Sequence, residues 1–520
     1  MGPRLPLNIV WLKRDLRLTD HAPLLAAEQA GDDYLIIYLY EPSLLKAPDS
    51  DLRHQRFVYQ SLVEMDDALL RFNKGVEVFH GEAVAVFQYL IETYTIGNIY
   101  SHEESGTRLT WERDKAVGKL LKENEIKWTE YQRDGVIRGI KSRKDWDKQW
   151  KEVIAAPLHA NTYYKVPHVY QKIDHPFALQ RDLEDQLKEK NKLMQHGGMS
   201  RGQEYLANFM EGRVKNYASS ISKPLKSRTS CSRISPYLAW GNLSLRQAYR
   251  FVSLHDNKSK YKRSTEGFLT RLHWHCHFIQ KFEVECEYET HCINRGYESL
   301  GYGNDQSLIT AWETGMTGLP LVDACMRCLH ATGWVNFRMR AMLVSVFCHH
   351  LDCDWRLGVY HLARLFLDYE PGIHYPQWQM QAGTTGVNTI RMYNPIKQSY
   401  DHDPDGLFIK EWVPELRDVP LQFLHEPWKM TALDRQFNSL NIDYPHPVIH
   451  IEQAARSARE KLWGHRDNPL VIKENKRILQ THVRPNSRKR RSTKSRLKSS
   501  TKSSTTEVTD ATPNPNLLNF

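Results

Sequence analysis

Charged and aromatic residues concentrate in the stretch from Trp312 to Asp401. They lie among apolar residues that recur at helical spacing, and they include Arg338, Arg340, Asp368, His374 and Trp378. A helix packed only for stability has no need of these charges, because a buried charge is costly unless it is paired or bound to a ligand. The stretch therefore predicts helices and loops around a ligand that is polar, large and flat.

A second group of polar residues could bind an anion. Tyr217 precedes the segment CSRIS (231–235), where a serine at a helix start would cap the helix and leave backbone N–H groups facing a phosphate. Taken alone, the longer segment SRISPYLAWG is also an ordinary helix start.

A third stretch, FLTRLHWHCHFIQKF (268–282), invites a metal interpretation. His273 and His277 stand at i and i+4 and would share one helical face. No C-x-x-C pair accompanies them at the spacing of a zinc site. Cys325 and Cys328 form such a pair elsewhere, but they fit a helical pattern as core residues. We therefore expect a partly buried polar helix here and no metal.

Longer motifs in these stretches are similar to those of one family. They are TGLPLVDACMRCLHATGW (317–334), DWRLG (354–358), WQMQAG (378–383) and RMYNPIKQSYDHDPDGLFIKEWVPELRDVP (391–420). HEPWKM (425–430), DYPHPVI (443–449) and NIVWLKRDLRLTDHAPL (8–24) extend the similarity over most of residues 8–460. The chain resembles the DNA photolyase/cryptochrome family, in particular the deoxyribodipyrimidine photolyases of bacterial type.

The resemblance implies an FAD pocket in the C-terminal half. In the family the turn at 231–235 meets the pyrophosphate, although Cys231 stands where Thr is usual, and an Arg–Asp pair lies beside the isoalloxazine ring. His374 takes the position facing flavin N5, where photolyases have Asn and many plant cryptochromes have Asp. The cofactor-binding residues implied are Tyr217, Ser232, Arg233, Ile234, Ser235, Arg340, Asp368, Tyr369, Glu370 and His374.

The resemblance also implies an electron path. Trp312, Trp355 and Trp378 match the family's three tryptophans, which pass an electron inward from solvent to the flavin. Spacing alone does not separate this role from that of ordinary core aromatic residues.

UV-damaged DNA is the partner that the resemblance implies. Trp274 matches the tryptophan on which a flipped pyrimidine dimer stacks, and Arg338 and Arg391 match arginines that hold phosphates beside the lesion. Arg271 stands where the cyclobutane-dimer photolyases carry a glutamate, so this position can donate to thymine carbonyls but cannot accept. The residues expected to act on the dimer and in electron transfer are Trp274, Arg271, Trp312, Trp355 and Trp378.

These implications give one expected function and two alternatives. The expected function is light-driven repair of cyclobutane pyrimidine dimers by an electron from excited, reduced FAD. A cryptochrome that senses blue light without repair is favoured by Arg271 and His374. A (6-4) photolyase is the third interpretation, although Asn336 and Arg340 stand where that type has its two histidines. A second, light-harvesting chromophore of folate or deazaflavin type remains open for the N-terminal domain.

The elements that must position these residues fall into two kinds. Strand patterns at Asn8–Leu12, Tyr34–Tyr40, Val76–His80 and Ile96–Ser101 alternate with helical patterns at His21–Ala30, Arg53–Phe72 and 81–94. This alternation predicts a doubly wound parallel sheet, and no G-x-G-x-x-G motif follows the first strand. We expect an α/β domain over 6–135, a connector over 136–200 with one helix at Ala178–Leu193, and an all-α FAD-binding domain over 201–482.

The amino-acid composition restricts the cellular location that we expect for the protein. No run approaches the ~18 apolar residues of a membrane span, and the N-terminus has no secretory h-region. Eight cysteines in 520 residues indicate reduced thiols rather than a disulfide scaffold. Residues 483–520 are expected to form a disordered basic tail, which holds seven of the ten net positive charges. We expect a monomer in the cytoplasm, or in the nucleus of a nucleated cell.

Overall fold

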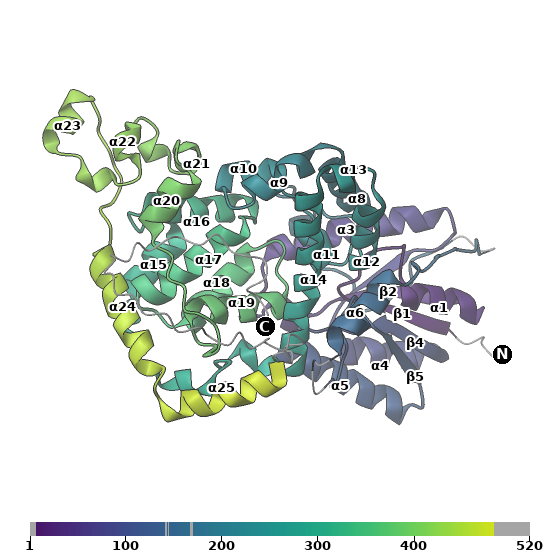
Figure 1. Cartoon of the computed structure of the whole chain (residues 1–520). Coiled ribbons are helices and arrows are strands. Elements are labelled where there is room, and N and C mark those ends of the chain that lie inside the picture. The colour runs from purple at the N-terminus through teal and green to yellow at the C-terminus, as the bar shows by residue number, and fades with distance from the viewer. Residues whose placement is uncertain (1–6, 141–142, 144, 167–169, 483–520) are drawn as a thin grey trace.

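A parallel α/β domain and a larger helical domain pack side by side in the computed structural model (Figure 1). The structure describes residues 7–140, 143, 145–166 and 170–482. The predicted basic tail, 483–520, lies outside the described residues. None of the helices in the described part of the chain combines the length and the apolar character needed to span a bilayer.

The N-terminal sheet has five parallel strands in the order β3-β2-β1-β4-β5. The strands are β1 (Leu7–Leu12), β2 (Tyr34–Tyr40), β3 (Val76–His80), β4 (Ile96–His102) and β5 (Lys127–Tyr131). Helices α1 (Ala22–Ala30), α2 (Pro42–Leu45), α3 (Leu52–Leu70), α4 (Ala83–Thr93) and α5 (Arg108–Glu123) connect them. The predicted fold class is therefore confirmed: a parallel α/β domain is followed by a helical one.

The edge strand β5 and the helix α5 before it were not predicted. The sequence of β5, KWTEY, mixes charged, polar and aromatic residues, and none of its residues is fully buried. A strand at a sheet edge needs no continuous apolar run, so its pattern is weak.

A buried carboxylate fixes the loop that leaves β1. Asp15 Oδ2 lies 2.9 Å from His21 Nε2 and 2.7 Å from His102 Nδ1, and all three side chains are buried. His21 Nδ1 accepts the backbone N–H of Leu24 at 3.2 Å, so the ring proton sits on Nε2, which lies near Asp15 without hydrogen-bond geometry. The cluster is therefore a buried carboxylate with two imidazole neighbours at the carboxyl edge of the sheet, one of which, His102, is hydrogen-bonded to it.

The connector differs from its prediction. It holds two helices, α6 (Trp146–Ala155) and α7 (Arg181–Lys188), instead of a single helix over 178–193. Helix α6 buries Trp146, Trp150 and Ile154, which recur every four residues. This short stripe lies among many charges, which is why the period is weak in the sequence.

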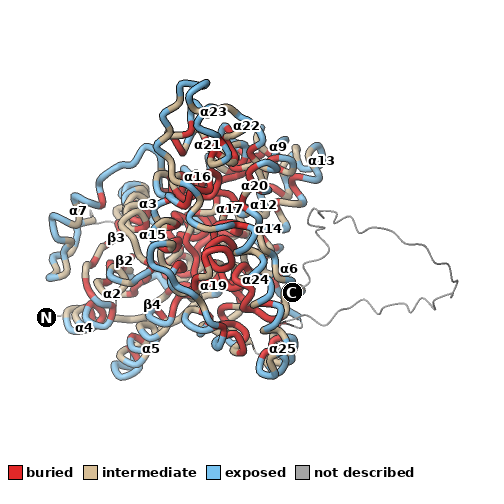
Figure 2. Tube along the Cα trace, turned by 90° about the vertical axis from the view of Figure 1, so that its left-hand side faces the viewer, coloured by how far each residue is buried: buried red, intermediate tan, exposed pale blue. Residues whose placement is uncertain are grey.

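The helical domain begins at α8 and contains no strand among the residues described from 199 to 482. Its first elements are α8 (Met199–Asn208), η1 (Phe209–Arg213), α9 (Val214–Ser220), α10 (Pro224–Ser230), α11 (Ser235–Ala239), α12 (Leu245–Leu254), α13 (Asn257–Lys260), α14 (Lys262–Val284), η2 (Cys286–Glu289) and η3 (Arg295–Ser299). The central elements are α15 (Gln306–Thr314), α16 (Pro320–Thr332), α17 (Phe337–Ser345), η4 (Val346–His350), α18 (Trp355–Leu365) and α19 (Pro371–Ala382). The last are α20 (Pro395–His402), α21 (Leu407–Trp412), η5 (Pro414–Leu416), α22 (Leu421–Leu424), η6 (Pro427–Lys429), α23 (Ala432–Phe437), α24 (Ile451–His465) and α25 (Pro469–His482). Buried residues concentrate around α16, α17 and α19 (Figure 2).

Some of the long motifs serve the fold rather than a ligand. Asp323, fully buried, accepts the backbone N–H of Thr317 at 2.8 Å and that of Gly318 at 3.0 Å, and it accepts the hydroxyl of Tyr444. Gly318 has φ +74°, and a Cβ there would lie 2.3 Å from the carbonyl oxygen of His446. The TGLPLVDA and DYPHPVI motifs therefore meet and lock the helical domain together.

Candidate active site

An ion pair lies at the centre of the helical domain. Arg340 Nη2, on α17, lies 2.8 Å from Asp368 Oδ2, and Arg340 Nε donates to the carbonyl oxygen of Val335 at 2.9 Å. The second carboxylate oxygen of Asp368 is buried and has no hydrogen-bond partner. The structure thus pairs Arg340 with Asp368 as predicted and leaves one acceptor open to a ligand.

The turn at 231–235 presents a buried arginine. Arg233 adopts φ +60°, which is uncommon for a non-glycine residue, and its Nη2 donates to Gln195 Oε1 at 2.9 Å. Its guanidinium lies 4.1 Å from the centre of the Trp334 ring, and burial lowers the pKa of Arg233 to about 10. Its Nε and the Ser230 hydroxyl are buried without a partner, which suits an anionic ligand such as a phosphate.

The remaining residues predicted for this turn lie close to it. Ser232 and Ile234 are buried, Ser235 opens α11, and Tyr217 packs on α9 against Phe209 and Phe268. Burial raises the pKa of Cys231 to about 11, so the thiol that replaces the usual threonine is neutral.

His374 lies in α19 as a neutral imidazole. Its Nε2 lies 2.9 Å from the carbonyl oxygen of Val359, which can only accept, so the ring proton sits on Nε2. Burial lowers the pKa of His374 to about 4, although the Val359 carbonyl favours the proton. The ring atom left for a ligand is therefore Nδ1, an acceptor.

This burial predicts an acid-labile fold. The folded-state pKa of His374 lies below the ordinary value of 6.5, so the unfolded chain takes up the proton first as the pH falls. Stability contributed by neutral His374 is complete above pH 6.5 and is lost toward pH 4. We expect His374→Asn to reduce the loss of unfolding free energy in this window by about 1.4 kcal/mol per pH unit. Denaturant titrations at several pH values measure this slope, and the matched change His291→Asn, at an exposed histidine, should leave it unaltered.

Tyr369 and Glu370 point toward the other domain. The Tyr369 hydroxyl donates to Asp49, and Glu370 Oε2 lies 3.3 Å from Arg14 Nη1 and 3.2 Å from Arg133 Nη2. Two acidic residues implied for cofactor binding therefore differ in their contacts: Asp368 belongs to the ion pair in the helical domain, whereas Glu370 joins the two domains.

The three predicted tryptophans are all buried, at 0% exposure for Trp312 and Trp355 and 2% for Trp378. The ring centres of Trp312 and Trp378 are 6.2 Å apart, and Phe347 packs against both rings. No ring contact joins Trp355 to either of them in the described part of the chain. The Trp312 side chain has no exposed surface, so it has no direct contact with solvent.

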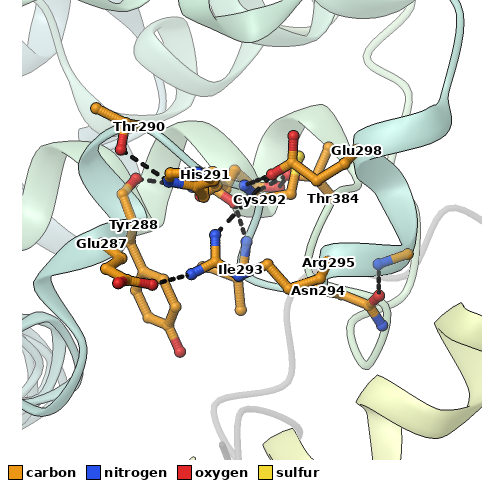
Figure 3. A network of polar contacts seen from close by, with 12 residues as sticks. Glu287, Tyr288, Thr290, His291, Cys292, Ile293, Asn294, Arg295, Glu298 and Thr384 are labelled. Atoms are coloured by element: carbon orange, nitrogen blue, oxygen red, sulfur yellow. Dashed lines mark hydrogen bonds and ion pairs between the residues drawn. The ribbon is translucent and has the colours of Figure 1, made fainter.

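A network of polar contacts holds the helix that carries Trp378. Figure 3 shows the segment from Glu287 to Glu298, in which the N–H of Cys292 donates to Glu298 and Arg295 pairs with Glu287. Gln379, the next residue after Trp378, donates to the carbonyl oxygens of Tyr288 and His291 at 2.8 Å and accepts the N–H of Ile293. This segment therefore fixes α19 in rotation and along its axis.

Trp274 and Arg271 line a cavity of about 330 Å³ between α14 and α19. On α14 the lining residues include four at i, i+3, i+4 and i+7, namely Arg271, Trp274, His275 and Phe278, and on α19 they include Ile373, Gln377 and Met380. The helices approach closely at Gly372, where a Cβ would lie 2.8 Å from Ile279 Cα. The cavity has the size and the largely apolar walls of a small-molecule site.

The charges of this cavity are all of one sign. Arg271, Lys281 and Arg391 line it, and no carboxylate does so among the described residues. The Arg271 guanidinium lies 5.5 Å from the centre of the Trp274 ring and 5.9 Å from that of Tyr217. Arg271 thus contacts both a wall of the cavity and one predicted cofactor residue, Tyr217.

The two predicted DNA-contacting arginines differ in their surroundings. Arg391 is exposed and lines the cavity, whereas Arg338 is half-buried with Nη1 3.4 Å from Gln398 Oε1. Arg338 Nε is buried without a hydrogen-bond partner. The structure places Arg391, but not Arg338, together with Trp274.

Several residues of the site carry no signal in the sequence. Gln195 fixes Arg233 from the connector, and Trp334 stacks on it. His275 Nε2 and Gln377 Oε1 are buried without partners, and both residues line the cavity. Such contacts depend on tertiary proximity. The helical spacing of His275 from Arg271 is the one sign that could have placed it on the cavity face.

The unpartnered polar atoms test whether FAD fits this domain. Buried polar groups are normally hydrogen-bonded, and those of Ser230, Arg233, His275, Asp368 and Gln377 are not. The Arg233 and Ser230 atoms belong to the turn, Asp368 Oδ1 belongs to the Arg340–Asp368 pair, and His275 and Gln377 line the cavity. An anionic pyrophosphate matches the cationic and hydroxyl atoms of the turn, and a ring with hydrogen-bond donors matches the open acceptor of Asp368, so the residues fit FAD.

Comparison with known proteins identifies both domains. A model described as DNA photolyase matches residues 8–147, and one described as the FAD binding domain of DNA photolyase matches residues 268–464. The deoxyribodipyrimidine photo-lyase of Alkalihalophilus pseudofirmus is 28% identical, with 88% of this chain and 98% of that protein covered. The cryptochrome DASH of Synechocystis sp. is 26% identical, with 88% and 97% covered.

Solved structures show the same architecture. A Synechocystis cryptochrome superposes with a TM-score of 0.78 at 24% identity, covering 88% of this chain and all of that one. The archaeal photolyase from Sulfolobus tokodaii, solved with two FAD molecules, gives 0.74 at 27% identity, with 88% and 100% covered. With both domain models matched in order and the site residues gathered in the helical domain, the chain belongs to the DNA photolyase/cryptochrome family.

Proposed function

We propose that the protein is a deoxyribodipyrimidine photo-lyase that repairs cyclobutane pyrimidine dimers in DNA with light. The observation that carries this proposal is the cavity beside the FAD-binding residues, which has an aromatic wall and only cationic charges. The two joined bases of a dimer must leave the helix to reach a buried cofactor, and an aromatic wall receives them. Relatives named deoxyribodipyrimidine photo-lyase, at 25–28% identity, support the assignment.

The cofactor residues have separate tasks in this proposal. Arg233 and the hydroxyls of Ser232 and Ser235 would hold the pyrophosphate, and Arg340 and Asp368 would lie beside the ring system, with His374 Nδ1 accepting. Tyr217 and Ile234 would complete the walls, while Tyr369 and Glu370 would position the loop from outside. When bound, reduced FAD excited by blue or near-UV light supplies one electron to the dimer and regains it after ring opening, so no net oxidation occurs.

The cavity residues would act on the dimer itself. Trp274 would stack on one pyrimidine, and Arg271 would donate to a thymine carbonyl oxygen. The dimer carries an extra negative charge while its carbon–carbon bonds break, and a carboxylate-free cavity with Arg271 and Lys281 stabilises that charge. Arg391 at the cavity and Arg338 beside it would hold phosphates without reading sequence.

The tryptophans would reduce the cofactor before repair. Trp378 would donate first, and Trp312 is its ring neighbour at 6.2 Å. Trp355, which is buried in the same core, would be the third tryptophan of the electron path.

A cavity of about 120 Å³ at the carboxyl ends of β1, β2 and β4 is the place where a doubly wound domain would hold a second chromophore. Its charged residues already pair with one another: Arg113 lies 2.9 Å from Glu41 and 2.6 Å from Glu104. None of these paired residues points to a folate or a deazaflavin in particular, so we assign no antenna to the cavity.

Each predicted domain has its own role in the proposed function. We propose that residues 6–135 form the photolyase-type α/β domain, 136–200 the connector and 201–482 the catalytic domain, with the protein acting as a monomer wherever the cell keeps its DNA.

The decisive experiment offers the reduced protein two oligonucleotides, one with a single cyclobutane thymine dimer and one with a single (6-4) lesion. We expect light to remove the cyclobutane dimer and leave the (6-4) lesion, because Asn336 and Arg340 stand where a (6-4) photolyase has its two histidines. Loss of neither lesion, with the flavin still reduced by light, would favour a cryptochrome. That alternative has its own support in the cryptochrome DASH relatives and in Arg271 and His374.

Arg271→Glu tests the departure at the cavity. It restores the residue usual in cyclobutane-dimer photolyases, so part of the repair should persist, whereas Arg271→Ala should lose a charged hydrogen bond worth about 1.5–3 kcal/mol. Affinity for dimer-containing DNA and repair under light measure both changes. If Arg271→Ala behaves as the wild type, the arginine is a solvated side chain with no part in binding the dimer.

A further inference from the structure

A half-exposed phenylalanine lines the cavity. Phe337 is 50% exposed and lines the same cavity as Trp274. It is the first residue of α17, and the preceding Asn336 caps that helix by accepting the N–H of Met339 at 3.0 Å. Leaving half of a large apolar ring in water forgoes much of the ~1.5–3 kcal/mol available from burying it.

The backbone that carries Phe337 is held firmly. Asn336 is 2% exposed, and its side-chain amide also donates to the Ser227 hydroxyl at 3.0 Å. Two residues further along, Met339 is fully buried. The ring is thus presented by a fixed helix start, with little freedom to fold away from the cavity.

The two aromatic residues approach the cavity from different helices. Trp274 comes from α14, and Phe337 comes from α17, next to Arg338. A cyclobutane dimer consists of two pyrimidine rings joined through their C5–C6 edges, and the planes of the two rings are inclined to each other. One flat wall can therefore cover only one of the rings.

We propose that Phe337 is the second stacking surface, so that Trp274 and Phe337 each cover one pyrimidine of the flipped dimer. This inference rests on the proposed function. Phe337 would then determine specificity for the lesion: a normal base or nucleotide meets one wall at a time, and only a joined pair meets both. Phe337 carries no charge, so it should add nothing to the affinity for undamaged DNA.

The test compares the dissociation constants for matched oligonucleotides with and without one dimer. Phe337→Ala should reduce the preference for the dimer by roughly 5- to 150-fold and leave affinity for undamaged DNA unchanged. Phe337→Tyr keeps the ring and should keep the preference, whereas Phe337→Leu keeps the apolar character but not the ring and should lose most of it. Phe251→Ala removes a comparably exposed phenylalanine of α12 that does not line the cavity, and it should have no effect.

Two results would overturn the inference while leaving the proposed function intact. They are an unchanged preference in Phe337→Ala, and a Phe337→Leu variant that equals the wild type, which would mean apolar contact without stacking. If the wild type itself shows no preference for the dimer, the proposed function fails and Phe337 has no dimer to stack on. Flavin content and melting temperature of each variant confirm that the exposed substitution leaves the fold unchanged.

Discussion

Trp378→Phe is expected to slow the light-driven reduction of bound FAD by roughly two orders of magnitude, equivalent to ~2.7 kcal/mol in the barrier. Indole gives up an electron far more readily than a phenyl ring, so phenylalanine preserves the packing and removes the donor. Trp378 is 2% exposed and contacts Trp312 at 6.2 Å between ring centres, which gives the electron a short onward step. Absorbance of the flavin under blue light with a thiol donor measures the rate.

The control is a tryptophan of equal burial in the other domain. Trp11 is 1% exposed in the core of the sheet, and Trp11→Phe should leave the rate unchanged. Trp312→Phe and Trp355→Phe then rank the two remaining candidates, and the contact with Trp378 predicts the larger effect for Trp312. A wild-type rate in Trp378→Phe would show that these tryptophans serve packing alone.

Trp274→Ala is expected to abolish most of the preference for DNA that carries a dimer. Stacking of a base on an aromatic side chain contributes about 1–3 kcal/mol, and the ring forms one wall of the cavity. Affinity for undamaged DNA should change little, because it depends on phosphate contacts. Competition binding at fixed salt concentration measures both affinities.

An exposed tryptophan outside the cavity provides the matched control. Trp463, on α24, is 47% exposed, and Trp463→Ala should leave the preference unaltered. Equal loss of affinity for damaged and undamaged DNA in Trp274→Ala would mean that Trp274 acts as a general surface contact, and the cavity would then lose its assigned substrate.

Four strands of the N-terminal sheet were predictable because each is a short segment rich in β-branched or aromatic residues. Tyr34–Tyr40, inside the sheet, and Val76–His80, at one edge, match the structure to the residue. Strand β5 was not predictable, because its residues are half-exposed at the sheet edge. Helix α6 was not predicted, because its only buried residues, Trp146, Trp150 and Ile154, lie in a segment with many charges.

The residues of the site were predictable where they belong to a sequence motif. They were not predictable where only tertiary contact brings them together. The pairing of Arg340 with Asp368 follows from the motif and is confirmed by their 2.8 Å contact. The partner of Arg233, Gln195, lies in the connector, and nothing in the sequence links the two residues. The resemblance implies Glu370 as a cofactor-binding residue, yet its carboxylate contacts Arg14 and Arg133 of the other domain.

The measurement that tests the account most directly is the number of dimers repaired by each reduced flavin. The reduced protein is mixed with a large excess of an oligonucleotide bearing one cyclobutane dimer, with no other electron donor, and illuminated without oxygen. Because the electron returns after each ring opening, we predict many dimers repaired per flavin and an unchanged flavin spectrum. Repair of no dimer, or of at most one per flavin with concurrent loss of the reduced spectrum, would contradict a light-driven, redox-neutral lyase.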